Sequence, residues 1–102
     1  MVKIHRLKTW PEPFDATQRG DKNFEIRKND RDYKKGDWLV LDRFSPEMGF
    51  SSDRVPLVRQ AIYVLSGFGL SDGYVAIGLD DCATVEIKKV ILELAPRRGE
   101  AS

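Results

Sequence analysis

Three side chains that can bind ligands or move protons lie close together in the N-terminal third of the sequence. They are Lys22, Glu25 and Arg27, in the segment GDKNFEIR. A lysine and an arginine on either side of a carboxylate form charge-assisted hydrogen bonds, which hold the side chains in place. Such a cluster can present donors and an acceptor to a polar or anionic ligand. A run of mixed charge is also typical of a solvated surface, where an exposed ion pair contributes about 0–1 kcal/mol.

The residues from 23 to 28 alternate between polar and apolar, which predicts a strand. On this strand Glu25 and Arg27 share one face. We expect Phe24 and Ile26, on the other face, to anchor the strand in the core and so to present the polar pair rigidly.

The remaining elements follow from periodicity and turn residues. A Pro-containing first turn after Thr9 predicts a helix, and Gly20 supplies its stop. Residues 85–94 fit a helical stripe better than a strand, although Val85 and Ile87 also alternate. Further strands are predicted at 2–8, 38–44, 54–66 and 74–79, separated by turns at 34–37 and 67–73 and a loop at 46–53. We therefore predict an α+β fold: a small curled or closed antiparallel β-barrel with a short crossover helix and a C-terminal helix.

Composition fits one ordinary globular domain. The chain has 102 residues, 41% apolar and 32% charged, with a formal net charge of +1. We expect the domain to cover residues 1–95, and residues 96–102, which lack an apolar anchor, to form a flexible tail. Cys82 is the only cysteine, which excludes an internal disulfide and favours the cytoplasm. We expect no cofactor, no metal site and no membrane segment.

The segment from Gly20 to Arg27 resembles the G-x-K-x-x-E-x-R signature of ASCH domains, a PUA-like β-barrel superfamily tied to RNA. Residues 5–41 and the later GLSDGYV segment resemble an uncharacterised ASCH-like subfamily of phages, plasmids and bacteria. The resemblance spans about residues 4 to 80. It implies a PUA-like barrel in which Lys22, Glu25 and Arg27 contact RNA or a nucleotide in a cleft beside the signature. Lys28, Asn29 and Arg31 would extend the phosphate contact.

The resemblance also implies an enzymatic alternative. Some ASCH proteins hydrolyse acylated cytidine with a threonine nucleophile beside the signature lysine, but Glu25 occupies that position here. An amidohydrolase acting on a modified nucleoside would instead use Glu25 as a general base toward water and Lys22 as an electrostatic stabiliser. Binding without catalysis is the leading hypothesis.

Three further residues have two interpretations each. His5, on the polar side of the first strand, either faces the cleft or is structural. Trp10 either stacks on a base or, as we favour, packs the helix against the barrel together with Phe14. Tyr74 either lines the cleft or belongs to the core. A third functional hypothesis is a host-interaction or partner-interaction protein, with Trp10 and the C-terminal segment forming the contact.

Overall fold

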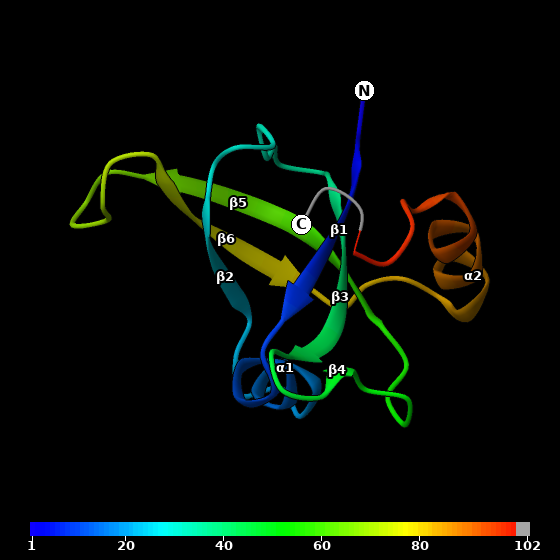
Figure 1. Ribbon diagram of the computed structural model, residues 1–102. Helices are drawn as coiled ribbons and strands as arrows, with labels where there is room; N and C mark the ends of the chain where they lie inside the picture. Colours follow the sequence, from blue (N-terminus) through cyan, green and yellow to red (C-terminus); the bar gives the residue numbers. More distant parts are fainter. Residues whose placement is uncertain (100–102) are drawn as a thin grey trace.

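The computed structural model describes residues 1–99 and shows an α+β fold built from a six-stranded sheet and two helices (Figure 1). The elements in chain order are β1 (Ile4–Thr9), α1 (Pro11–Gln18), β2 (Phe24–Lys28), β3 (Trp38–Ser45), β4 (Gly49–Phe50), β5 (Leu57–Ser66), β6 (Tyr74–Asp80) and α2 (Val85–Leu94). The predicted strands and both helices are confirmed, and the predicted 46–53 loop contains the short strand β4.

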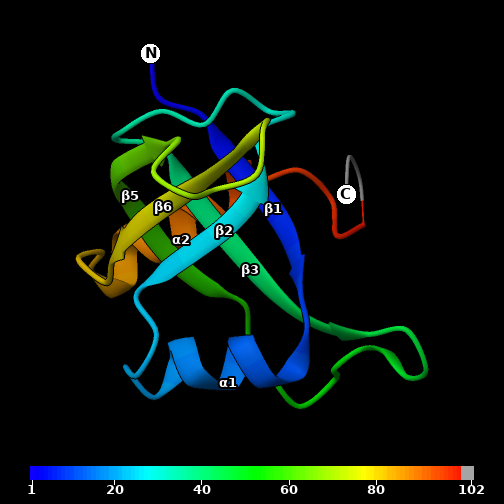
Figure 2. The same cartoon turned by 90° about the vertical axis from the view of Figure 1, so that its left-hand side faces the viewer.

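The sheet is mixed rather than antiparallel. Its strand order is β1-β3-β5-β6-β2, and β4 pairs with β3. β1 and β3 run parallel, with Ile4 opposite Trp38, whereas the other pairs are antiparallel. The chain leaves β1, crosses one end of the sheet as α1 and returns along β2 (Figure 2). β3 therefore starts beside the start of β1, which makes these two strands parallel and corrects the antiparallel prediction.

The sheet curls until its two edge strands, β1 and β2, face each other across a seam. In the described residues no backbone ladder joins them, so the predicted closure into a barrel is not seen as a hydrogen-bonded sheet. Two arginines reach across instead. Arg27 Nη2 donates to the carbonyl oxygen of Lys8 at 3.0 Å, and Arg31 Nη1 donates to that of Arg6 at 2.9 Å. Carbonyls that a neighbouring strand would otherwise satisfy are paired by guanidinium groups.

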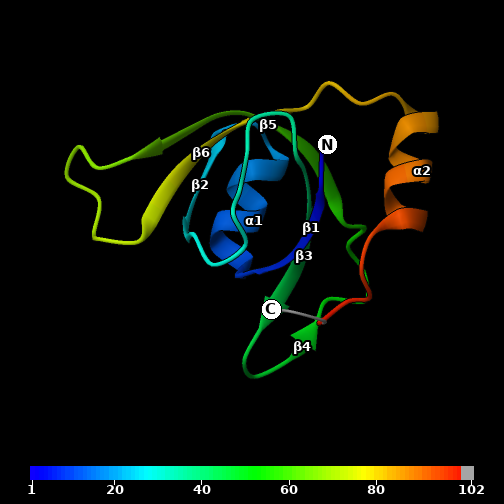
Figure 3. The ribbon, with the colours of Figure 1, turned by 90° about the horizontal axis from the view of Figure 1, so that it is seen from above.

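The main core fills the inside of the curled sheet, and α1 covers one end of it (Figure 3). Phe14 of α1 is fully buried and belongs to the same core cluster as Leu41 and Ile77, as predicted for this residue. Trp10, rather than Thr9, is the helix N-cap, and Pro11 is in the first turn. Gly20 has a φ of +88°, so it adopts the left-handed conformation expected of a helix stop. Trp10 is 61% exposed, which corrects the expectation that it packs α1 against the sheet.

The helix α2 lies on the outer side of the sheet. Ile91 packs on Val40 and Val58, and the Thr84 hydroxyl accepts a hydrogen bond from the Ile87 amide at 3.2 Å. After α2, Arg98 Nε donates to Asp42 Oδ1 at 3.2 Å. The expected flexible tail, residues 96–102, extends beyond the described residues, and its flexibility stays a prediction. Neither helix of the described chain is long and apolar enough to cross a membrane.

Candidate functional site beside Glu25

The strand β2 faces the opposite way from the sequence-based expectation. Glu25 is only 3% exposed and points into the sheet interior, whereas Phe24 and Ile26 are 45% and 53% exposed. The predicted anchoring of Phe24 and Ile26 in the core is therefore wrong. Alternation gives the period of a strand but not which face is buried. Here the charged face points inward because Glu25 has cationic partners that compensate its burial.

Both oxygens of Glu25 accept hydrogen bonds from neighbouring cations. Lys22 Nζ donates to Oε2 and also to the carbonyl oxygen of Phe24. Arg27 approaches Oε1 with Nε at 2.9 Å and Nη2 at 2.8 Å. The structure thus brings together the three residues that the sequence singled out. Glu25 and Arg27 share a face, as predicted.

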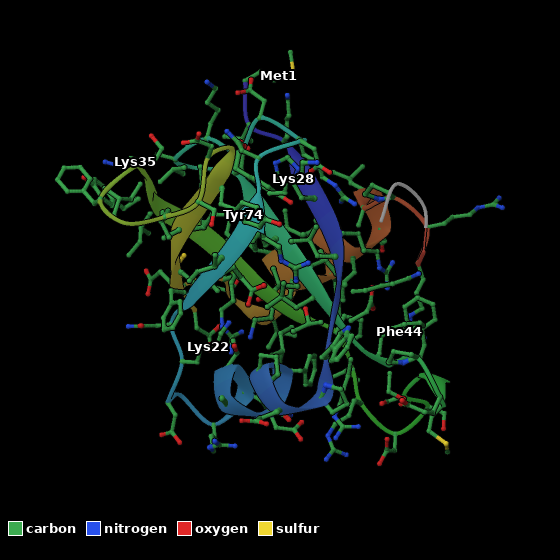
Figure 4. All side chains as sticks on the ribbon, turned by 60° about the vertical axis from the view of Figure 1, so that its left-hand side comes forward. Met1, Lys22, Lys28, Lys35, Phe44 and Tyr74 are labelled. Atoms are coloured by element: carbon green, nitrogen blue, oxygen red, sulfur yellow. The ribbon has the colours of Figure 1, made fainter. Side chains whose placement is uncertain are left out.

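Arg27 also ties this cluster to the other side of the seam. Besides the Lys8 carbonyl, its Nη2 contacts the Thr9 hydroxyl at 3.3 Å. The end of β1 and the middle of β2 are therefore held by one guanidinium. Figure 4 shows Lys22 near α1 and Lys28 toward the other end of β2, so the seam runs away from the helix.

A pocket of about 340 Å³ opens at this cluster. We call it the Glu25 pocket; it is lined by Thr9, Trp10, Lys22, Phe24, Glu25 and Arg27, among others. The aromatic rings of Trp10 and Phe24 are exposed at its border, and Lys22 Nζ lies 5.1 Å from the centre of the Phe24 ring. The pocket therefore combines charged hydrogen-bonding groups with apolar walls.

Hydrogen-bonding capacity remains in the Glu25 pocket. An ammonium has three protons, and Lys22 uses two of them on Glu25 and Phe24. Glu25 Oε2 accepts from Lys22 and retains a second lone-pair direction. A ligand in the pocket can thus meet a cationic donor next to an anionic acceptor without breaking the existing pairs.

A second pocket, of about 350 Å³, adjoins the first along the seam. We call it the Arg31 pocket; Lys8, Trp10 and Arg27 line both pockets, and Lys28, Asp30, Arg31 and Tyr33 line this one. Two predicted residues, Lys28 and Arg31, are thus beside the candidate site. The predicted residue Asn29 is not in either lining. Its Oδ1 accepts from the Tyr33 amide at 3.0 Å, which stabilises the turn after β2.

The structure places His5 and Tyr74 away from the Glu25 pocket. His5 is buried, and its Nε2 lies 2.8 Å from Asp37 Oδ2. Burial acts to raise the pKa of Asp37, but hydrogen bonds from His5 and from the amides of Lys3 and Lys34 outweigh it, so the pKa is lowered. Tyr74 begins β6 opposite Lys28 and borders a separate pocket beside the β5–β6 hairpin.

Sequence reasoning missed Lys8 and Thr9. Both end β1 immediately before the Trp10-Pro11 entry to α1, and the strand-to-helix junction is the signal that could have identified them. Lys8 lines the Glu25 pocket, and its Nζ lies 4.6 Å from the centre of the Phe44 ring on β3. Among the described residues, no group of His, Cys, Asp and Glu side chains is arranged to hold a metal ion.

Comparison with known proteins identifies the family. The chain belongs to the DUF3850 family, a domain of unknown function, whose model matches residues 4–79. The match includes β1, α1 and β2, and therefore every residue of the Glu25 pocket, but it ends before α2. The chain is also similar to a protein of Escherichia phage P2 described as an uncharacterized 12.9 kDa protein in the GpA 3′ region. The two are 46% identical over 41 residues, which is 40% of this chain and 38% of the phage protein.

Proposed function

We propose that this DUF3850 domain binds RNA, or a nucleotide derived from RNA, with one nucleobase in the Glu25 pocket. The observation that carries the proposal is the composition of that pocket. A buried carboxylate held by two cations forms its polar part, and an exposed tryptophan forms one wall.

A nucleobase fits this combination chemically. Its faces are aromatic and stack on side chains such as Trp10, and its edge carries both donors and acceptors. Lys22 supplies a donor to a base carbonyl or ring nitrogen, and Glu25 supplies an acceptor to an exocyclic amine. The two exposed aromatic borders, Trp10 and Phe24, stabilise the base through its faces.

The curled sheet with α1 at one end supports a relationship to the PUA-like superfamily, and the GDKNFEIR segment supports its ASCH branch. In this proposal the curled sheet keeps β1 and β2 apart beside the GDKNFEIR segment, so that a ligand can enter between them. The seam residues come from β1, α1 and β2, which are consecutive in the chain. The site is therefore built by one supersecondary unit.

Contacts at Glu25 favour binding over hydrolysis. Both oxygens of Glu25 are paired with cations, so a proton taken from water by Glu25 would remove the negative charge on which the pairs with Lys22 and Arg27 depend. The amidohydrolase alternative requires that loss at each turnover.

The test is a titration of the uniformly ¹⁵N-labelled full chain with each of the four ribonucleoside monophosphates, followed by NMR. We expect shifts of the Trp10 indole and of amides from Phe24 to Arg27, while the Trp38 indole, on the α2 side of the sheet, stays unchanged. Lys22→Ala should remove the shifts, and Lys89→Ala, an exposed lysine on α2, should retain them. Shifts confined to another face, or none at all, would contradict the proposal. New product resonances with an N-acylated nucleoside would favour the enzyme.

A further inference from the structure

The two pockets of the seam differ in how their charges are balanced. In the Glu25 pocket, Lys22 and Arg27 are paired with a buried carboxylate. Around the Arg31 pocket, Lys8, Lys28 and Arg31 form no ion pair with a carboxylate in the described part of the chain. In the Glu25 pocket the positive charge is partly compensated by Glu25, whereas around the Arg31 pocket cations without a carboxylate partner among the described residues leave a larger excess of positive charge.

The Arg31 side chain is held in place by a hydrogen bond to the backbone of β1. Its Nη1 donates to the Arg6 carbonyl at 2.9 Å, which fixes the guanidinium at the border of the pocket and leaves its other N–H groups for a ligand. Lys28 is exposed at the end of β2, and Lys8 lines the pocket although its ammonium group lies over the Phe44 ring of β3. Asp30 is the one carboxylate among the lining residues.

We infer that the Arg31 pocket is a phosphate subsite, so that the ligand is a phosphorylated nucleotide or an RNA strand rather than a free nucleoside. The inference rests on the proposed function of the Glu25 pocket. Because Arg27 and Trp10 line both pockets, a base in the first pocket places the phosphate attached to its ribose at the second. Guanidinium and ammonium groups are the side chains that bind phosphate oxygens most strongly.

This arrangement also selects single strands. A base that enters the Glu25 pocket has its edge toward Lys22 and Glu25, where a Watson–Crick partner would otherwise be. The ligand class is therefore a nucleotide with a 3′- or 5′-phosphate, alone or at an unpaired position of RNA.

The experiment measures dissociation constants by calorimetry for each nucleoside and its 3′- and 5′-monophosphates with the full-length protein. One of the two monophosphates should bind about tenfold more tightly than the nucleoside. This factor corresponds to one charge-assisted hydrogen bond to the phosphate. Lys28→Gln should reduce that ratio, and Asp30→Asn should increase it, because the two substitutions change the charge of the Arg31 pocket in opposite directions. Lys89→Gln is the matched control and should leave the ratio unchanged. Circular dichroism melts verify that each variant is folded.

Two results would overturn the inference. If nucleosides and monophosphates bind equally well and Trp10→Ala weakens both, the Glu25 pocket binds a base but the Arg31 pocket binds no phosphate. If neither class of ligand binds, the proposed function and this inference both fail. Opposite shifts for Lys28→Gln and Asp30→Asn, seen only with phosphorylated ligands, would support the subsite.

Discussion

Arg27 on β2 donates a 3.0 Å hydrogen bond from Nη2 to the carbonyl oxygen of Lys8 on β1, across a seam where a strand-to-strand ladder is missing. The same guanidinium contacts the buried Glu25 carboxylate at 2.8 Å. One side chain therefore connects the two edges of the sheet and completes the candidate site. Stability and ligand binding should both depend on it.

We predict that Arg27→Lys destabilises the protein although it conserves charge. The planar guanidinium of Arg27 contacts Glu25 and the Lys8 carbonyl at the same time. A lysine ammonium lacks this geometry, so one of the two groups loses its partner. The expected loss in the free energy of unfolding is about 1–3 kcal/mol. Urea denaturation at neutral pH measures it. Lys28→Ala, at the next position but exposed, should change stability by less than about 0.5 kcal/mol. Equal midpoints for both variants would show that the seam contact is not stabilising.

The inverted facing of β2 gives a second prediction. Ile26→Ala should cost less than about 1 kcal/mol because the side chain is 53% exposed. Ile77→Ala, on the paired strand β6 and fully buried, should cost about 2–5 kcal/mol. The same substitution on two adjacent strands isolates burial as the variable. If Ile26→Ala were as damaging as Ile77→Ala, β2 would have the orientation that its sequence suggested.

This inversion shows what sequence patterns can and cannot establish here. Periodicity and turn residues located five strands, both helices and the Gly20 stop, because these are local properties, but they did not locate the short strand β4. Which face of β2 is buried depends on Lys22 and Arg27 compensating Glu25, and that compensation becomes visible only when the three are in contact. The general rule that apolar residues face inward failed where a buried carboxylate is paired with two cations.

The parallel pairing of β1 and β3 also could not be predicted from the sequence pattern. It depends on where α1 and β2 carry the chain between them, which is a property of tertiary packing. Likewise His5 and Glu25 both occupy polar positions in alternating strands, yet His5 binds Asp37 and Glu25 lines a pocket. The residue types indicated that His5 and Glu25 could form polar contacts. Which partner each side chain contacts depends on the topology of the sheet.

The buried His5–Asp37 pair predicts how stability changes in acid. The pKa of Asp37 is lowered from its ordinary value of 3.8, so its ionised form favours the folded state. That contribution is complete above pH 3.8 and is lost as the pH falls through the lower pKa of the folded state. Urea midpoints measured from about pH 5 down to about pH 2 should therefore fall more steeply for the wild type than for Asp37→Asn.

Asp15 provides a comparison for the acid prediction. Its pKa is also lowered, chiefly by a hydrogen bond from Arg43, but it is much more exposed than Asp37. Asp15→Asn should reduce the pH dependence of the urea midpoint less than Asp37→Asn does. Parallel profiles for the wild type and Asp37→Asn would contradict the assigned role of Asp37.

Asp42 should anchor the segment that follows α2. It is buried, and it accepts from Arg6 at 2.7 and 3.0 Å and from Arg98 at 3.2 Å. Asp42→Asn leaves the largely buried Arg6 guanidinium without its carboxylate and should cost about 3–5 kcal/mol. Arg98→Ala, whose side chain is more exposed, should cost about 1 kcal/mol or less. Thermal unfolding separates the two, and similar losses would show that Asp42 acts mainly through Arg98.

The most direct test of the central claim is the affinity of the full-length protein for a short single-stranded RNA, measured by fluorescence anisotropy with wild type and Trp10→Ala. Stacking on one aromatic ring contributes about 1–3 kcal/mol, so Trp10→Ala should weaken binding by about fivefold or more. Phe68→Ala, which removes an exposed ring from the β5–β6 hairpin, should bind like the wild type. Equal affinities for Trp10→Ala and wild type would contradict a base in the Glu25 pocket.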